Sequence, residues 1–265
     1  MFPLHTKSFP SSAPELAGLM NKSVQRVFIT TGDPVTIEGG VYPALESVRI
    51  RLDHARLRPG PPRPPTVSGK RAHALQVRDL HLEGSHLSLG PATADLRLEA
   101  RDVRFDQARD AENGIVLLFQ SAASGEVQIL ADKAELEKTI AALASQEAGK
   151  QGVTIEDVSL KFHERGARSL SVEVQVKARK LFFSTVIRIA ADLDLDDELN
   201  ATISGLACKG DGAIGTLACG VLVPHLQKLD GRTFSLLALP LGDIRLRDVR
   251  IAAADTISVT AEFGV

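Results

Sequence analysis

Two periodicities of apolar and polar residues divide the chain into helical and extended segments. Residues 11–28 open with Ser11, Ser12 and Pro14, which is a helix-start signal. Apolar residues then recur at helical spacing, which predicts an amphipathic helix: Leu16, Leu19, Met20, Val24 and Val27. From Leu45 onward the period becomes two, because apolar Val48, Ile50 and Leu52 alternate with charged residues. This alternation is typical of a strand with one wetted face.

Period-two segments predict that most of the remaining chain is extended. We expect strands over 74–83, 86–90, 94–106, 114–129, 153–163, 168–180, 182–196, 232–239, 243–252 and 256–263. A helix is expected over 132–148, where Asp132 and Glu135 resemble a capping box, and another over 211–229. Residues 59–65 (PGPPRPP) exclude a regular element, because proline lacks the backbone donor. They predict a stiff surface loop, with a proline-rich recognition motif as the alternative.

One pattern, apolar–x–Asp–apolar–x–apolar, recurs along the chain. In it the alternation slips by one residue at the aspartate, as happens at a β-bulge. The four aspartates are Asp79, Asp102, Asp157 and Asp248. Because bulges bend strands, the repeat predicts long, curved antiparallel strands. The alternative, that these carboxylates are metal ligands, requires them to converge in space.

Composition narrows the function classes. The chain has 265 residues, of which 44% are apolar and 24% charged, as is ordinary for a globular protein. A net charge of −2 and a scarcity of aromatic residues argue against nucleic-acid binding. Cys208 and Cys219 do not make a disulfide framework, and we expect two partly buried free thiols. Met1–Ser12 lacks a continuous apolar stretch, so a cytoplasmic location is expected, or the cell envelope if a leader is missing.

No motif with catalytic chemistry stands out, and we expect a protein that is not an enzyme and has no cofactor. Residues 210–215 (GDGAIG) form a literal G-x-G-x-x-G. However, Asp230 precedes the next predicted strand, whereas the acid of a dinucleotide fold follows it. We interpret these glycines as a helix entry that packs tightly against neighbouring backbone, with nucleotide binding as the alternative. The acidic residues near Asp192–Glu198 are interpreted as a wetted strand face, with calcium binding as the alternative.

Apolar surface is the feature that remains. Both helices after residue 130 carry apolar residues, and a curved sheet around them would leave a groove suited to acyl chains. The candidate lipid-binding residues are Leu136, Ile140, Leu143, Phe182, Phe183, Leu217, Val221 and Leu222.

The C-terminal half carries a family resemblance. A helix over 132–148 is followed by strands, then by residues 223–231 (VPHLQKLDG), 236–242 (LLALPLG), 244–251 (IRLRDVRI) and 259–264 (VTAEFG). With residues 39–42 (GGVY) and the strand 48–52, this order resembles the LmeA-type phospholipid-binding proteins of bacteria. These belong to the tubular lipid-binding (TULIP) superfamily, and the resemblance covers about residues 20–264.

The resemblance implies an α+β fold with a long, highly curved antiparallel sheet wrapped around one or two long helices. It also implies an elongated apolar cavity for phospholipid and carries no catalytic residue. We therefore expect an N-terminal amphipathic arm over 1–30 and one lipid-binding domain over 31–265. The expected partner is a phospholipid or another acyl ligand, with peripheral membrane contact. The alternative function is a protein-interaction domain with a solid core and no ligand.

Overall fold

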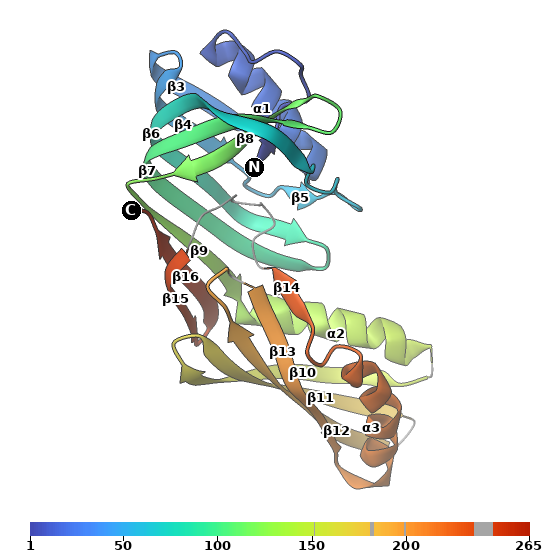
Figure 1. Cartoon of the computed structure of the whole chain (residues 1–265). Coiled ribbons are helices and arrows are strands. Elements are labelled where there is room, and N and C mark those ends of the chain that lie inside the picture. The colour runs from blue at the N-terminus through green and yellow to red at the C-terminus, as the bar shows by residue number, and fades with distance from the viewer. Residues whose placement is uncertain (151, 181–182, 199, 236–245) are drawn as a thin grey trace. The chain divides into compact units, whose positions relative to one another are not determined.

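The computed structural model describes residues 1–265 except 151, 181–182, 199 and 236–245 (Figure 1). The protein is an α+β protein in which strands predominate. Its chain forms two compact units. Unit 1 comprises Met1–Leu130, Leu237–Asp248 and Thr260–Val265, and unit 2 comprises Ala131–Leu236 and Val249–Val259.

The larger sheet has the strand order β15-β16-β9-β7-β6-β4-β3. Among the described residues, the strand pairs of this sheet are antiparallel except β4–β6 and β5–β6, which are parallel. The elements up to residue 132 are β1 (Phe2–Pro3), α1 (Ala13–Val27), β2 (Phe28–Ile29), β3 (Val35–Val41), β4 (Ala44–Arg51), β5 (Arg56–Leu57), β6 (Val67–Leu89), β7 (Ala92–Asp110), β8 (Ile115–Ser121) and β9 (Ser124–Asp132). The last two strands are β15 (Leu246–Ala253) and β16 (Thr256–Phe263).

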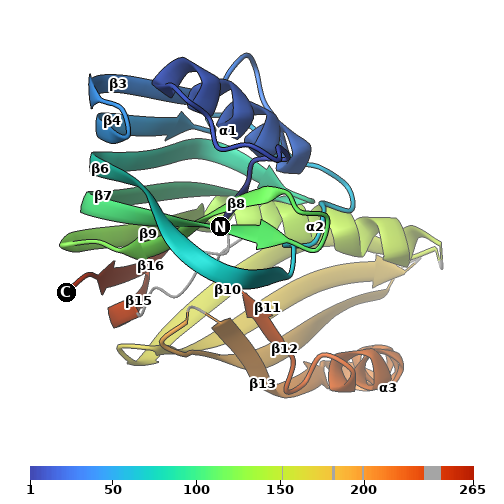
Figure 2. The ribbon, with the colours of Figure 1, turned by 45° about the horizontal axis from the view of Figure 1, so that its top comes forward.

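Helix α1 lies against β3 (Figure 2). Its N-cap is Ser12, whose hydroxyl accepts a hydrogen bond from the backbone N–H of Glu15. The side chains of Leu16, Met20 and Val24 are buried, as is the polar side chain of Asn21. The amide oxygen of Asn21 accepts a hydrogen bond from the N–H of Val35 at 2.7 Å, which ties the helix to the start of β3.

A separate five-stranded antiparallel sheet forms most of unit 2, in the order β10-β11-β12-β13-β14. The elements are α2 (Lys133–Gly149), β10 (Thr154–Gly166), β11 (Ser169–Lys180), β12 (Phe183–Leu195), β13 (Asn200–Gly210), α3 (Gly212–Gln227) and β14 (Thr233–Ser235). Asp132 caps α2, accepting a hydrogen bond from the N–H of Glu135, as the sequence predicted.

Most predicted elements are present, with two differences in how strands are divided. The predicted strand 86–90 is the end of β6 and not a separate strand. The predicted strand 114–129 is two strands, because β8 and β9 pair with different stretches of β7. Residues 59–65 form no strand or helix. Parts of the strands predicted over 232–239 and 243–252 lie outside the described residues. The arm over 1–30 and the domain over 31–265 stay predictions.

The bulge prediction holds at one aspartate and fails at another. The pairing of β10 with β11 shifts register between Ile155 and Asp157, as a bulge does. Asp102 and Asp248 have φ values of 50° and 49°, which interrupt the extended backbone. Asp79, in contrast, keeps its register on β7, so the prediction is wrong there.

The prediction of two free cysteine thiols does not hold in the structure. Cys208 and Cys219 are joined in a disulfide with a Cα–Cα distance of 5.5 Å. The expectation of two free thiols is therefore wrong. Cys208 lies near the end of β13 and Cys219 within α3, and the short connection folds the helix back onto the strand. No helix in the described part of the chain has the length and apolar character needed to cross a membrane.

Candidate apolar ligand site

One face of the unit 2 sheet is apolar from strand to strand. Residues directly opposite each other in antiparallel strands present their side chains on the same face. The register aligns Leu160 of β10 with Val174 of β11, Val174 with Ile189 of β12, and Ile189 with Cys208 of β13. A second row aligns Val158, Val176 and Ile187. The alternate row is polar and includes Gln175 opposite Arg188. The sheet thus separates an apolar face from a polar one.

Helices α2 and α3 contact strands toward opposite edges of this sheet. Helix α2 contacts β10, and the carboxylate of Glu137 accepts a hydrogen bond from the N–H of Leu160 at 2.7 Å. Helix α3 contacts β13 and β12. Because Cys208 belongs to the apolar row, its disulfide to Cys219 places α3 on the apolar face.

The helices leave the apolar side chains of the middle strands incompletely covered. Val158, Leu160, Val176 and Ile187 are buried. Other side chains of the same face are only half-buried: Phe162, Val172, Val174, Ile189, Leu193 and Ile203. A strip of branched aliphatic side chains therefore keeps contact with solvent across β11, β12 and β13. Such a strip suits an elongated aliphatic ligand better than a flat aromatic one.

The predicted lipid-binding residues fall into three groups. Leu136 and Ile140 of α2 and Leu222 of α3 are half-buried. The other described members are exposed: Leu143 by 46%, Phe183 by 61%, Leu217 by 73% and Val221 by 60%. Phe182 lies outside the described residues. Nothing here brings all of these side chains into one enclosed cavity, and their role in lipid binding stays a prediction.

Apart from Phe183 at the start of β12, the described sheet residues of the apolar face are absent from that predicted set. Their signal in the sequence is the unbroken alternation over 169–178 (SLSVEVQVKA), which assigns every second residue to one face. This alternation predicts a strand, whereas the candidate ligand residues lie on the two helices and at the head of the strand over 182–196.

Helix α3 is apolar all round, and its outer side is uncovered. Gly215 and Cys219 are buried toward the sheet, while Ile214, Leu217 and Val221 are exposed. No charged residue occurs between Gly212 and Gln227. Most large exposed hydrophobic side chains of the described chain lie in unit 2, the exceptions being Ile29, Val41 and Val265. On α3, the positions of Ile214, Leu217 and Val221 share one side of the helix and form an exposed apolar stripe.

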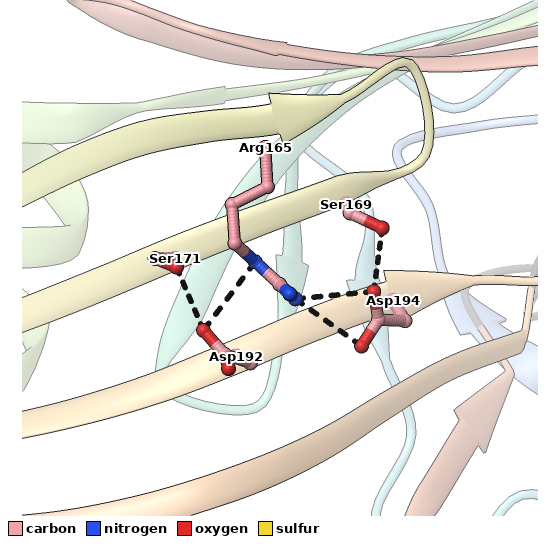
Figure 3. A network of polar contacts seen from close by, with 5 residues as sticks. All are labelled: Arg165, Ser169, Ser171, Asp192 and Asp194. Atoms are coloured by element: carbon pink, nitrogen blue, oxygen red, sulfur yellow. Dashed lines mark hydrogen bonds and ion pairs between the residues drawn. The ribbon is translucent and has the colours of Figure 1, made fainter.

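The polar face of the same sheet carries the acidic residues for which calcium was the alternative. Figure 3 shows the guanidinium of Arg165 between Asp192 and Asp194, with Arg165 Nη2 3.1 Å from Asp194 Oδ1. The hydroxyls of Ser171 and Ser169 donate to the same two carboxylates. Arginine and serine side chains thus bind these two carboxylates, which supports the interpretation of this region as the solvent-facing side of a strand.

Asp196 has a separate structural role in the turn after β12. Its carboxylate accepts hydrogen bonds from the N–H groups of Glu198 and Asn200 and from the Asn200 amide. Burial by itself raises the pKa of Asp196, but these hydrogen bonds stabilise the charged form and lower the pKa overall. The turn is therefore tied by an ionised carboxylate.

The glycines of the G-x-G-x-x-G sequence join β13 to α3 at close range. A Cβ atom on Gly210 would meet the backbone of Gly215, and one on Gly215 would lie 2.6 Å from the Thr185 hydroxyl oxygen. Gly212 has a φ of +68° at the start of α3. The interpretation as a tightly packed helix entry is confirmed.

Replacing Gly210 with alanine is expected to destabilise unit 2 by about 1–3 kcal/mol, because the new Cβ overlaps backbone that has no room to move. Denaturant unfolding followed by circular dichroism measures this change. Gly220→Ala is the matched control, since no atom lies within 4 Å of a Cβ there. Equal stability of the Gly210→Ala variant and the parent would contradict the packing role.

Comparisons with known proteins identify no relative: no family model, curated protein or solved structure matches the chain.

Proposed function

We propose that the protein is a non-enzymatic lipid-binding protein that holds acyl chains on the apolar face of unit 2. The observation that carries the proposal is the strip of half-buried aliphatic side chains on the apolar face of the sheet, including Val174, Ile189 and Leu193. Each methylene of a ligand moved from water onto such a surface contributes about 0.8 kcal/mol before the costs of binding. A ligand with a long alkyl chain therefore fits best.

The outer side of α3 supports contact with a bilayer as part of the same function. Ile214, Leu217 and Val221 present an uncharged, exposed apolar stripe. A lipid-binding protein that docks through this stripe would load or release its ligand without exposing the acyl chain to water. The resemblance of the sequence to LmeA-type TULIP proteins agrees with both parts of the proposal.

The disulfide supports a location different from the cytoplasm. Disulfides persist in oxidising compartments and are rare where thiol reductants are abundant. With Cys208 and Cys219 paired, we propose an oxidising compartment, such as the bacterial cell envelope, as the working location.

Changing the sheet surface without changing its shape tests the ligand site. The double variant Val172→Thr, Val174→Thr keeps β-branched side chains and places two hydroxyls on the strip. Because each hydroxyl loses hydration beneath an alkyl chain at a cost of about 0.5–2 kcal/mol, affinity for a fluorescent fatty acid should fall at least about fivefold. Displacement of the probe by unlabelled phospholipid measures the affinity.

The matched control is Gln175→Thr, on the polar face of the same strand. It should bind the probe as the parent does. Equal affinity of the parent, the double variant and the control would contradict the proposed site. Retained fatty-acid binding together with loss of liposome flotation in Leu217→Gln, Val221→Gln would assign the α3 stripe to the bilayer; unchanged flotation would assign that stripe to a protein partner.

A further inference from the structure

Three side chains that could coordinate a metal converge on the outer face of the unit 1 sheet. The groups are His81 and Glu83 of β6 and Glu99 of β7, whose ligand atoms all lie within 4.8 Å of one another. His81 and Glu83 are two residues apart on one strand, so they share a face. The register sets Glu99 directly opposite His81, with 3.8 Å between His81 Nδ1 and Glu99 Oε1.

The cross-strand partner expected for Glu83 is engaged elsewhere. The register sets Arg97 opposite Glu83. However, the Arg97 guanidinium turns along its own strand and donates to Glu99 Oε1 from Nε at 3.0 Å and from Nη2 at 2.6 Å. Among the described residues, the carboxylate of Glu83 makes no hydrogen bond or ion pair, although Arg97 interacts with it electrostatically and Arg51 of β4 lies level with it. This carboxylate therefore stays available beside the imidazole, and Arg97 holds Glu99 through one oxygen only.

A hollow of about 340 Å³ adjoins this group and supplies space for further ligands. His81 and Glu99 are part of its lining, together with the acidic residues Asp79, Glu126 and Glu262 and one cation, Arg101. Glu126 lies directly opposite Glu99 in the pairing of β7 with β9. Arg49 of β4 stands level with His81 on the other side. The lining is thus predominantly acidic, which favours a cation over an anion.

We propose that His81, Glu83 and Glu99 bind a divalent first-row transition-metal ion, with water from the hollow completing its coordination. An imidazole nitrogen with two carboxylates suits Zn²⁺ or Mn²⁺, whereas Ca²⁺ and Mg²⁺ take oxygen ligands alone. Small rotations of flexible side chains bring the ligand atoms onto one ion. The site lies on unit 1, so it is independent of the acyl-chain site proposed on unit 2.

Titration of the metal-stripped, tag-free full chain with Zn²⁺ against a competing chelator dye tests the proposal. One ion per chain is expected. His81→Ala and Glu83→Gln should each weaken binding at least about tenfold, since even the outer partners of metal ligands are worth about 10–100-fold. X-ray absorption of the loaded protein should show nitrogen and oxygen neighbours at about 2.0–2.2 Å and no sulfur.

The matched controls are His73→Ala, an exposed histidine of the same strand, and Glu112→Gln, an exposed glutamate of unit 1. Both should bind Zn²⁺ as the parent does, and circular dichroism should show every variant folded. Absence of Zn²⁺ binding at sub-millimolar concentration would overturn the proposal. So would equal losses in the His81 and His73 variants, because these would indicate adventitious binding by surface histidines.

Discussion

Replacing Cys208 and Cys219 together with serine is expected to destabilise unit 2 by about 2–4 kcal/mol. The disulfide closes a separation of 11 residues and fixes α3 on the apolar face of the sheet. The bond acts together with the close packing of Gly215 against Gly210, whereas Leu217 and Val221 are exposed and add little contact with the sheet. Without the bond, the helix should pack less firmly on the sheet. Denaturant unfolding of the oxidised parent and the double variant measures the difference.

Reduction provides the control for this first prediction. Dithiothreitol should shift the unfolding of the parent toward that of the serine variant and should leave the variant itself unchanged. Affinity for a fluorescent fatty acid should fall in step, because α3 borders the proposed ligand surface. A parent whose stability does not respond to reduction would contradict the structural role of the bond.

The second large effect is expected from Phe119→Ala in unit 1, at about 3–5 kcal/mol. Phe119 is 6% exposed and makes edge-to-face contacts with Phe105 and Phe263, at ring-centroid distances of 5.8 and 5.9 Å. The ring of Phe263 in turn occupies the space above Gly125. Removing the central ring leaves a cavity among side chains from three strands, β7, β8 and β16.

Denaturant unfolding measures this loss, and Phe234→Ala is the matched control. Phe234 is 43% exposed, so its truncation should change the free energy of unfolding by about 0.5 kcal/mol or less. Similar stabilities of the two variants would contradict the contribution of this aromatic cluster to the unit 1 core.

Local patterns made the secondary structure largely predictable. The alternation over 169–178 predicted β11, and Asp132 predicted the start of α2, because both signals depend only on near neighbours. The disulfide was missed for the opposite reason. Whether Cys208 meets Cys219 depends on how α3 folds back over β13. Gly210 and Gly215 allow the close approach, but their presence in the sequence does not show over which face of the sheet the helix folds.

The candidate sites show the same limit. An apolar helix without a polar side gives no indication of which residues face the sheet. The sequence therefore does not distinguish the exposed Leu217 and Val221 from the buried Cys219. The spacing of His81 and Glu83 is visible in the sequence, but Glu99 joins them only through the register of β6 with β7. Long-range pairing decides both sites.

Native mass spectrometry of the unmutated protein, before and after incubation with phospholipid vesicles, shows whether the protein holds lipid. We expect an adduct with the mass of a fatty acid or phospholipid, one per chain, that is lost in the Val172→Thr, Val174→Thr variant. A protein that is free of lipid after purification and takes up none from the vesicles would not be a lipid-binding protein.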